Sequence, residues 1–354
     1  MFRYVLRRLL QAIPTLLGVS IISFVLVNST PGDPILIRTF DPNITQETRE
    51  ILRQQLGLDQ SLPLQYIRWF TGYMIRPGNV VADFQTDKVS CRYLPFLGQT
   101  VCDTGGGIVR GNLGTSISTK QPVWDRMVER MPATLELGVA SLFLTLLLGV
   151  PLGVLSAVKQ GSWFDNAVRF LAVVGNAVPA FWLGIMLIFL FGVYLGVLPT
   201  GGRQTLTLEN EFDVVDRLRH LILPAFILAF GGIAGISRFM RTETLEVIRT
   251  DYIRTARAKG LPGSRVWFVH ALRNALIPLM TILGPAITGV LTGAVITETI
   301  FAWPGMGRLT FSAAVQRDYP MVLGAVMFFS LLTILGNLLS DILYGVVDPR
   351  VRLS

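Results

Sequence analysis

Long apolar runs separated by polar connections organise this chain of 354 residues. A helix needs about 20 mostly apolar residues to cross the hydrocarbon core of a bilayer. Runs of about this length occupy residues 9–27, 134–158, 170–194, 221–240, 276–301 and 321–344. The pattern predicts an all-α membrane protein with six transmembrane helices and a large loop between the first two.

The first run follows Arg3, Arg7 and Arg8, and the apolar core of a cleaved signal peptide also follows basic residues. The run is long for a signal core, however, and the sequence Val-Asn-Ser-Thr-Pro at 27–31 offers a poor cleavage site. We therefore expect residues 1–27 to form an uncleaved N-terminal anchor helix, with a signal peptide as the alternative.

Arginine and lysine residues predict the orientation of the spans, because short cytoplasmic connections are enriched in them. Cationic residues form four groups. The first precedes the first run, the second consists of the residues at 159 and 169, the third has eight members between 238 and 273, and the fourth follows the last run. With six spans, all four groups fall on one side. Both termini and the loop 241–275 are therefore expected in the cytoplasm, the loop 28–133 outside, and a five-helix core at 134–354.

The composition agrees with a membrane protein. Hydrophobic residues make up 51% and charged residues 15%, whereas soluble domains have about 25% charged residues. The net charge of +8 does not indicate nucleic-acid binding, because the positive residues gather at the ends of apolar runs and form no patch interleaved with aromatics.

The predicted external loop holds Cys91 and Cys102, the only cysteines in the sequence. Thiols outside the cytoplasm are oxidised, so two cysteines in one exported segment most simply form a disulfide. Two free, buried thiols are the alternative. Earlier in the loop, residues 45–58 have apolar side chains at helical spacing and predict a surface helix.

Several residues within the spans are candidates for helix packing or for lining a path. Glycines four positions apart let another helix approach closely, and prolines interrupt helices. The candidates are Asn176, Pro179, Gly284, Gly289 and Gly293. Close packing is the simpler interpretation. A Pro-Gly turn flanked by aromatics at 298–307 predicts a re-entrant or interfacial segment.

A basic connector between the fourth and fifth runs carries the most specific signal. Thr250 or Asp251 can cap a short helix, and Gly260 followed by Pro262 can end it. Its short side chains leave room for close approach, and its basic side chains can bind acidic or backbone groups of a partner. The residues expected to dock are Asp251, Tyr252, Arg254, Thr255, Ala256, Arg257, Ala258, Lys259 and Gly260. An amphipathic helix resting on anionic lipid is the alternative.

The connector sequence Asp-Tyr-Ile-Arg-Thr-Ala-Arg-Ala-Lys-Gly-Leu at 251–261 resembles the EAA loop of permease subunits of ATP-binding-cassette importers, in the dipeptide, oligopeptide and nickel branch. Where the wider superfamily has Glu-Ala-Ala, this chain has Arg254, Thr255 and Ala256. Other segments similar to the family lie at 31–34, 57–59, 111–116, 130–135, 220–224, 298–305, 317–320 and 348–350. Residues 72–110 are longer than the family spacing, which predicts an insertion around the cysteines.

The resemblance implies the type I importer fold, in which two related permeases enclose a translocation path. Each permease inserts its connector helix into a groove on one of two cytoplasmic ATPase subunits, and an external substrate-binding protein delivers the cargo. It implies a transport subunit of a bacterial or archaeal cytoplasmic membrane, not an enzyme, with ATP and Mg on the ATPase subunits. The sequence agrees, since none of its four lysines lies in a phosphate-binding loop. His220 and His270 fall on opposite sides of the membrane, so no metal site is expected.

Peptides are the expected cargo, with nickel complexes or another solute as the alternative. An ion-coupled secondary transporter is a different possibility, but such proteins carry ionisable residues in their spans. The centres of these runs are almost free of acidic groups. A channel or scaffold would not need a basic connector helix.

Overall fold

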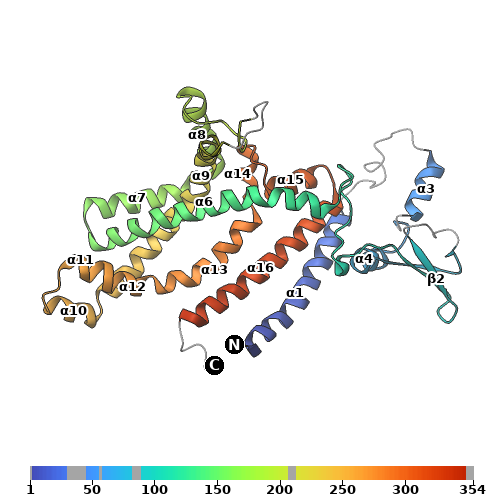
Figure 1. The fold of residues 1–354 in the computed structure, drawn as a ribbon, viewed down its shortest axis with the longest axis horizontal. Helices are drawn as coiled ribbons and strands as arrows, with labels where there is room; N and C mark the ends of the chain where they lie inside the picture. Colours follow the sequence, from blue (N-terminus) through green and yellow to red (C-terminus); the bar gives the residue numbers. More distant parts are fainter. Residues whose placement is uncertain (1, 30–44, 56–57, 82–88, 206–212, 348–354) are drawn as a thin grey trace. The chain divides into compact units, whose positions relative to one another are not determined.

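The computed structural model describes residues 2–29, 45–55, 58–81, 89–205 and 213–347 (Figure 1). The family-like segments at 31–34 and 348–350 and part of that at 57–59 lie outside these residues. The chain divides into two compact units. The first, here called the helical unit, comprises Met1–Arg8, Arg130–Leu309 and Leu332–Ser354, and the second, the mixed unit, comprises Leu9–Glu129 and Thr310–Leu331.

The helical unit takes most of its residues from the middle of the chain. Its elements are α6 (Val123–Val158, which begins in the mixed unit), α7 (Trp163–Ala177), α8 (Ala180–Leu187), a π-helical turn (Ile188–Tyr194), α9 (Val214–Ile248), α10 (Asp251–Ala258), α11 (Gly263–Arg265), a second π-helical turn (Val266–Ala271), α12 (Leu272–Ala275), α13 (Ile277–Thr292), α14 (Val295–Ile300) and the start of α15 (Met306–Val315).

Four described helices are long and apolar enough to cross a bilayer. They are Leu6–Asn28, Val123–Val158, Val214–Ile248 and Tyr319–Leu338. The pair Trp163–Ala177 and Ala180–Tyr194 would be a fifth span, but it is bent by 101°. The structure thus confirms a helical membrane protein with four or five apolar spans, and it does not confirm a count of six.

The bend lies at Pro179, inside the third predicted span. Proline disfavours helical backbone at the residue before it, and Val178 accordingly has φ −78° and ψ 124°. Asn176, in the last turn before the bend, donates from Nδ2 to the carbonyl oxygen of Ala172 at 2.8 Å. The amide nitrogen of Asn176 is therefore bonded within its own helix.

The fifth predicted span, 276–301, is also broken. Helix α13 has 16 residues, which corresponds to about 24 Å at the rise of an α-helix, short of the roughly 30 Å of a bilayer core. Gly293 follows it with φ +80° and ψ 159°, a conformation that favours glycine. Gly289 therefore lies within α13, whereas Gly293 lies directly after the helix end.

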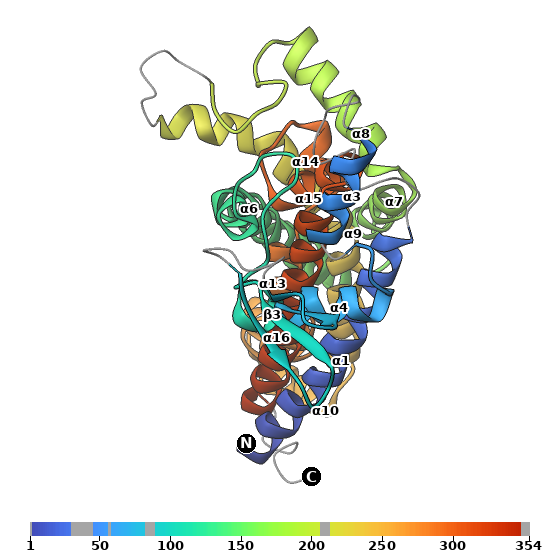
Figure 2. The same cartoon turned by 90° about the vertical axis from the view of Figure 1, so that its right-hand side faces the viewer.

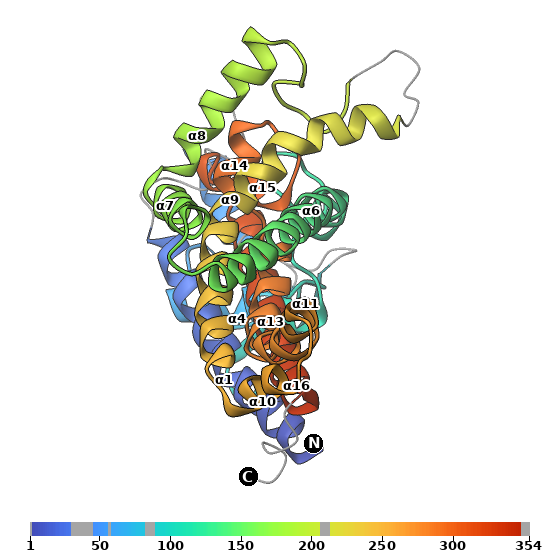
Figure 3. The same cartoon turned by 90° about the vertical axis from the view of Figure 1, so that its left-hand side faces the viewer.

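Close glycine contacts bring α6 and α9 together. A Cβ atom at Gly153 would lie 2.5 Å from the carbonyl oxygen of Ser237, and one at Gly232 would lie 2.8 Å from Oγ1 of Thr145. Side chains at either position would push the helices apart. Figures 1 and 3 show α7 alongside α9, where Gly175 faces Ala234.

A buried ion pair fastens the turn between α6 and α7 to α9. Asp165 is 0% exposed, and its two oxygens accept from Nε and Nη2 of Arg241 at 2.7 and 2.8 Å. Ser156 donates its hydroxyl, and Gly161 its backbone N–H at 3.0 Å, to the same carboxylate. Bidentate geometry of this kind fixes orientation as well as distance, so three segments are held at one point.

The mixed unit contains α1 (Phe2–Asn28, whose first turns belong to the helical unit), α3 (Gln46–Gln55), α4 (Leu62–Thr71), a 3₁₀ turn (Ile108–Arg110) and the first part of α16 (Tyr319–Val347). It also contains a sheet of three antiparallel strands in the order β1-β3-β2, formed by β1 (Tyr73–Pro77), β2 (Ser90–Leu94) and β3 (Gln99–Asp103). Figure 2 shows the sheet next to α4. The expectation of an all-α fold is therefore wrong for this segment, because five-residue strands give too little alternation to be recognised.

Two sets of contacts tie this unit together. The hydroxyl groups of Ser20 on α1 and Tyr66 on α4 lie 2.7 Å apart, and the ring of Tyr66 packs edge-on against Phe24. Asp318, 1% exposed, accepts from the hydroxyl of Ser116, from Ile117 N at 3.0 Å and from Oγ of Ser118 at 2.9 Å. The family-like segments at 111–116 and 317–320 thus meet, although they are far apart in sequence.

Cys91 on β2 and Cys102 on β3 occupy directly opposed positions and form the predicted disulfide. Mass spectrometry of the unreduced protein should therefore find the two cysteines linked. Replacing both with serine should lower the local free energy of opening of the sheet by about 2–4 kcal/mol, measured by hydrogen exchange of the β3 amides. Two freely alkylated thiols in the native protein would contradict this assignment.

The Asp165–Arg241 pair predicts unequal effects of removing either partner. Arg241→Gln leaves a fully buried carboxylate without its counter-charge and should lower the opening free energy of α7 by about 3 kcal/mol. Asp165→Asn leaves a guanidinium that is 20% exposed and can reach water. This variant should therefore lower the opening free energy of α7 by only about 1 kcal/mol. Hydrogen exchange of the α7 amides measures both variants, and equal effects would contradict the asymmetry.

Candidate functional site

Helix α10 forms the connector that the sequence singles out. Its N-terminal cap residue, Thr250, donates its hydroxyl to Val247 O at 2.6 Å and makes no side-chain bond to α10. The helix ends at Ala258, and Gly260 has φ +71°. Glycine adopts this left-handed conformation without steric cost, which explains why the helix stops where the sequence predicts.

One face of α10 packs against the chain that follows it. Ile253 is 0% and Ala256 9% exposed, and they form an apolar cluster with Val266 and Ala271. Ala256 therefore differs from its expected role on the partner-facing side, because its small side chain serves contact with the body of this chain. Figures 1 and 3 show α10 at the same end of the helical unit as α11.

The opposite face of α10 is exposed. It presents Asp251, Tyr252, Arg254, Thr255, Arg257, Ala258 and Lys259, with Gly260 beyond the helix end. Two of these side chains contact residues of the segment that follows α10. The guanidinium of Arg257 lies 4.6 Å from the ring centre of Trp267, and the hydroxyl of Tyr252 accepts from Nδ2 of Asn274 at 2.8 Å.

Arg254 and Asp251, in contrast, form an ion pair with each other on the exposed surface of α10. The paired atoms lie 3.2 Å apart, but the side chains are 74% and 94% exposed, and such surface pairs contribute little stability. Both groups can therefore exchange this contact for one with a partner. The exposed face combines an ordered aromatic and basic part with adaptable charges.

Helix α10 is connected to the interior of the helical unit by α9. Arg241, which pairs with Asp165, lies in α9 about two turns before the end of that helix. A displacement of α10 would therefore act on α9 close to the point that is joined to α6 and α7. The sequence did not reveal this pair, because its members are 76 residues apart.

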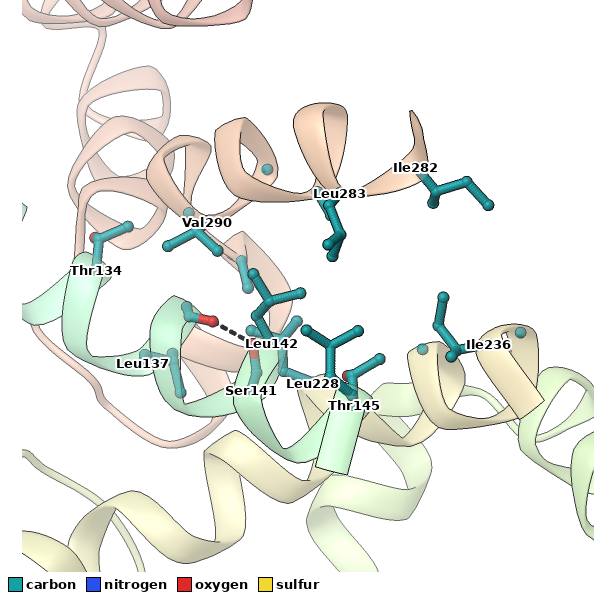
Figure 4. Close-up of a pocket in the computed structure, with 18 of the residues that line it drawn as sticks. Thr134, Leu137, Ser141, Leu142, Thr145, Leu228, Ile236, Ile282, Leu283 and Val290 are labelled. Atoms are coloured by element: carbon teal, nitrogen blue, oxygen red, sulfur yellow. Dashed lines mark hydrogen bonds between the residues drawn. The ribbon is translucent and has the colours of Figure 1, made fainter. Parts of the chain in front are cut away.

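A cavity of about 470 Å³ lies between α6, α9 and α13 (Figure 4). Its walls are mainly apolar, with Leu137 and Leu142 on α6 and Ile282 and Leu283 on α13. The hydroxyl of Ser141 donates to the backbone oxygen of Gly138 at 2.9 Å, and that of Thr145 donates to Ala229 O at 3.4 Å. The polar wall groups are thus satisfied within the chain.

The glycines predicted in this region have different surroundings. Gly289 lines the cavity, and a Cβ atom there would meet no atom within 4 Å. Gly293 lines it at the end of α13, and Gly284 is buried. Asn176 and Pro179 are exposed and do not line this cavity. The small residues of α6 and α9 that shape its walls were not predicted, although their spacing in the apolar runs was a usable signal.

Comparison with known protein families identifies both halves of the chain. The family model described as "Binding-protein-dependent transport system inner membrane component" matches residues 149–353. A second model, described as "Binding-prot-dependent transport system membrane comp, N-term", matches residues 1–138. The two matches together leave only a short segment in α6 between them.

Curated relatives match over nearly the whole chain. The oligopeptide transport system permease protein AppB of Bacillus subtilis (strain 168) is 41% identical, over 99% of this chain and 100% of its own length. The dipeptide transport system permease protein DppB of Escherichia coli (strain K12) is 38% identical, over 99% of both chains. These relatives are named as transport permeases, not as enzymes.

Among solved structures, an inward-facing crystal form of the MetNI methionine ABC transporter matches 63% of this chain and 96% of its own chain, with 19% identity and a TM-score of 0.47. This likeness is too low to support a conclusion about the fold. The family matches and the two permease relatives are sufficient without it. The chain belongs to the family of binding-protein-dependent transport system inner membrane components.

Proposed function

We propose that this chain is the transmembrane permease subunit of an ATP-driven importer of dipeptides or oligopeptides. The observation that carries the proposal is α10, a short helix with one buried apolar face and one exposed basic face. The relatives AppB and DppB, which are named for oligopeptide and dipeptide transport, support the cargo class. The proposed fold is that of type I importers with six spans, α13 and α14 together taking the place of the fifth, and both termini in the cytoplasm.

The proposed assembly contains a second permease, two cytoplasmic ATPase subunits and an external substrate-binding protein. The exposed face of α10 would lie in a groove of one ATPase subunit. ATP hydrolysis would take place there, and the cavity between α6, α9 and α13 would form part of the path for cargo. The apolar walls suit side chains of varied peptides, because apolar surfaces impose little directional selectivity.

Coupling between α10 and the cavity follows from the internal packing. Ile253 and Ala256 hold α10 to the segment that follows it, while α9 joins α10 to the Asp165–Arg241 pair. A movement of the ATPase groove would therefore shift α9 and the walls of the cavity. Such coupling requires a contact that differs between nucleotide states, since equal affinity for both states shifts nothing.

The proposed function predicts ATP-dependent peptide uptake by the assembled transporter in vesicles. Uptake should require the ATPase subunits and should stop when ATP is replaced by a nonhydrolysable analogue. Uptake driven by an ion gradient without the ATPase subunits would contradict the proposal. Uptake of a nickel complex but not of peptides would agree with an ATP-driven importer and would contradict the proposed peptide cargo.

The docking role predicts different effects of the same charge change at two exposed arginines. Arg254→Glu, on the exposed face of α10, should weaken binding of the ATPase subunit by at least about tenfold, the loss of a contact worth about 1.4 kcal/mol. Arg265→Glu, on α11, should weaken it by less than about threefold. Titration of ATPase subunits onto reconstituted permease measures both. Equal weakening would indicate nonspecific attraction by the basic connector instead.

A further inference from the structure

Glu298 on α14 is the only ionisable residue among those that line the cavity in the described part of the chain. Its neighbours in the wall include Thr134, Gly293 and Ala294. The side chain is 0% exposed. An ionisable side chain at membrane depth is costly to bury and usually has a function, and the transport scheme above assigns none to this group.

The carboxylate of Glu298 is held by backbone donors. Oε2 accepts from Arg308 N at 2.7 Å, and Oε1 accepts from Ala294 N at 3.3 Å and from Oγ1 of Thr134 at 3.4 Å. Arg308 N belongs to the first turn of α15, whose Met306 N donates to Thr134 Oγ1 at 2.7 Å. Donors at a helix N-terminus favour the charged form of a carboxylate, whereas burial favours the neutral form.

The glycines around this carboxylate leave room only for its present position. A Cβ atom at Gly305 would lie 2.4 Å from Cδ of Glu298, and one at Gly293 would lie 3.0 Å from Oε1. Trp303, which is also fully buried, donates from Nε1 to Ala133 O at 2.8 Å and fixes the turn against α6. The predicted re-entrant segment therefore places one carboxylate at a defined point of the cavity wall.

No described residue forms an ion pair with Glu298. The side chain of Arg308 instead donates to Ala302 O at 2.7 Å. The N-terminus of α15 contributes a partial charge of about +0.5 and the C-terminus of α13, which ends beside the same carboxylate, about −0.5. The two helix ends thus oppose each other in sign, and Glu298 is the one acidic group at this end of the cavity, whose lining residues in the described part of the chain supply no cationic side chain.

We infer that the Glu298 end of the cavity attracts cations and receives the protonated amino group of the cargo during transport. This inference depends on the proposed peptide cargo, whose amino terminus has an ordinary pKa of about 8 and is therefore positive at pH 7. Because the carboxylate is covered, it acts through its field across the wall and not by direct contact. In the proposed orientation α13 runs outward, so cargo meets this end first.

Single cysteines in the cavity can measure this field directly. Cys91 and Cys102 are joined in a disulfide, so a cysteine placed at Val290 or Ile282 is the one free thiol of the full-length chain. Figure 4 shows Val290 near Thr134 and Ile282 towards the opposite end. These two positions on α13 are eight residues apart, or about 12 Å along the helix.

The probes are two methanethiosulfonate reagents, one with a trimethylammonium group and one with a sulfonate group. The ratio of their reaction rates, cation over anion, should be higher at Val290→Cys than at Ile282→Cys in the otherwise native chain. Adding Glu298→Gln should lower the ratio about tenfold at Val290→Cys and less than about threefold at Ile282→Cys. An unchanged ratio would show that Glu298 carries no charge and would overturn the inference.

Thr134→Val is the matched structural control. It removes the hydroxyl that bonds Glu298 and Met306 but keeps the carboxylate, so it should leave the ratio within about twofold of the native value. An equal effect of Thr134→Val and Glu298→Gln would assign the change to structure and also overturn the inference. If Glu298→Gln does not fold, the two cysteine variants of the otherwise native chain still test the inference. Equal ratios at Val290→Cys and Ile282→Cys would then overturn it. No ATPase or cargo is needed, so this outcome is separate from that of the uptake experiment.

Discussion

The packing of α10 against the segment that follows it is the interaction on which the account depends. Ile253 and Ala256 are buried on one side of a helix whose other side is exposed. Without this contact α10 would be a short tether that could bind a partner but could not transmit force. In the proposed function, this contact and the Asp165–Arg241 pair on α9 are the links that would turn a push on α10 into a movement of the membrane helices.

Segments that look unrelated along the sequence meet in pairs in the folded chain. Within the helical unit, Thr134 and Ala133 on α6 bond the turn that carries Glu298 and Trp303. Within the mixed unit, Asp318 bonds residues 116–118. Each pair joins a buried carboxylate to backbone or hydroxyl donors, as burial of charge in an apolar environment requires. The family-like segments therefore stabilise the fold through these hydrogen bonds. The segment that carries Glu298 also lines the cavity.

Local signals were predictable from the sequence, and distant pairings were not. The apolar runs and the helix end at Gly260 followed from spacing and residue type, and the disulfide followed from the position of both cysteines in one predicted external loop. Pro179 and Gly293 were noticed, but their effect on whole spans, a sharp bend and a helix end, depends on the packing of neighbouring helices. The hydrogen-bond partners of Asp165 and Glu298 could not be inferred, because a single sequence does not show which distant residues contact each carboxylate in the folded chain. Ala256 was misplaced for the same reason, since helical spacing does not say which face the rest of the chain covers.

The central claim is that the exposed face of α10 binds an ATPase subunit and that this contact changes with nucleotide. A benzophenone attached to a cysteine at Ala258, which is exposed on that face, tests it in the assembled transporter. We expect light-induced cross-linking to the ATPase subunit, with a yield that differs between nucleotide-free and ATP-bound complexes. Cross-linking to lipid alone, or an equal yield in both states, would contradict the account.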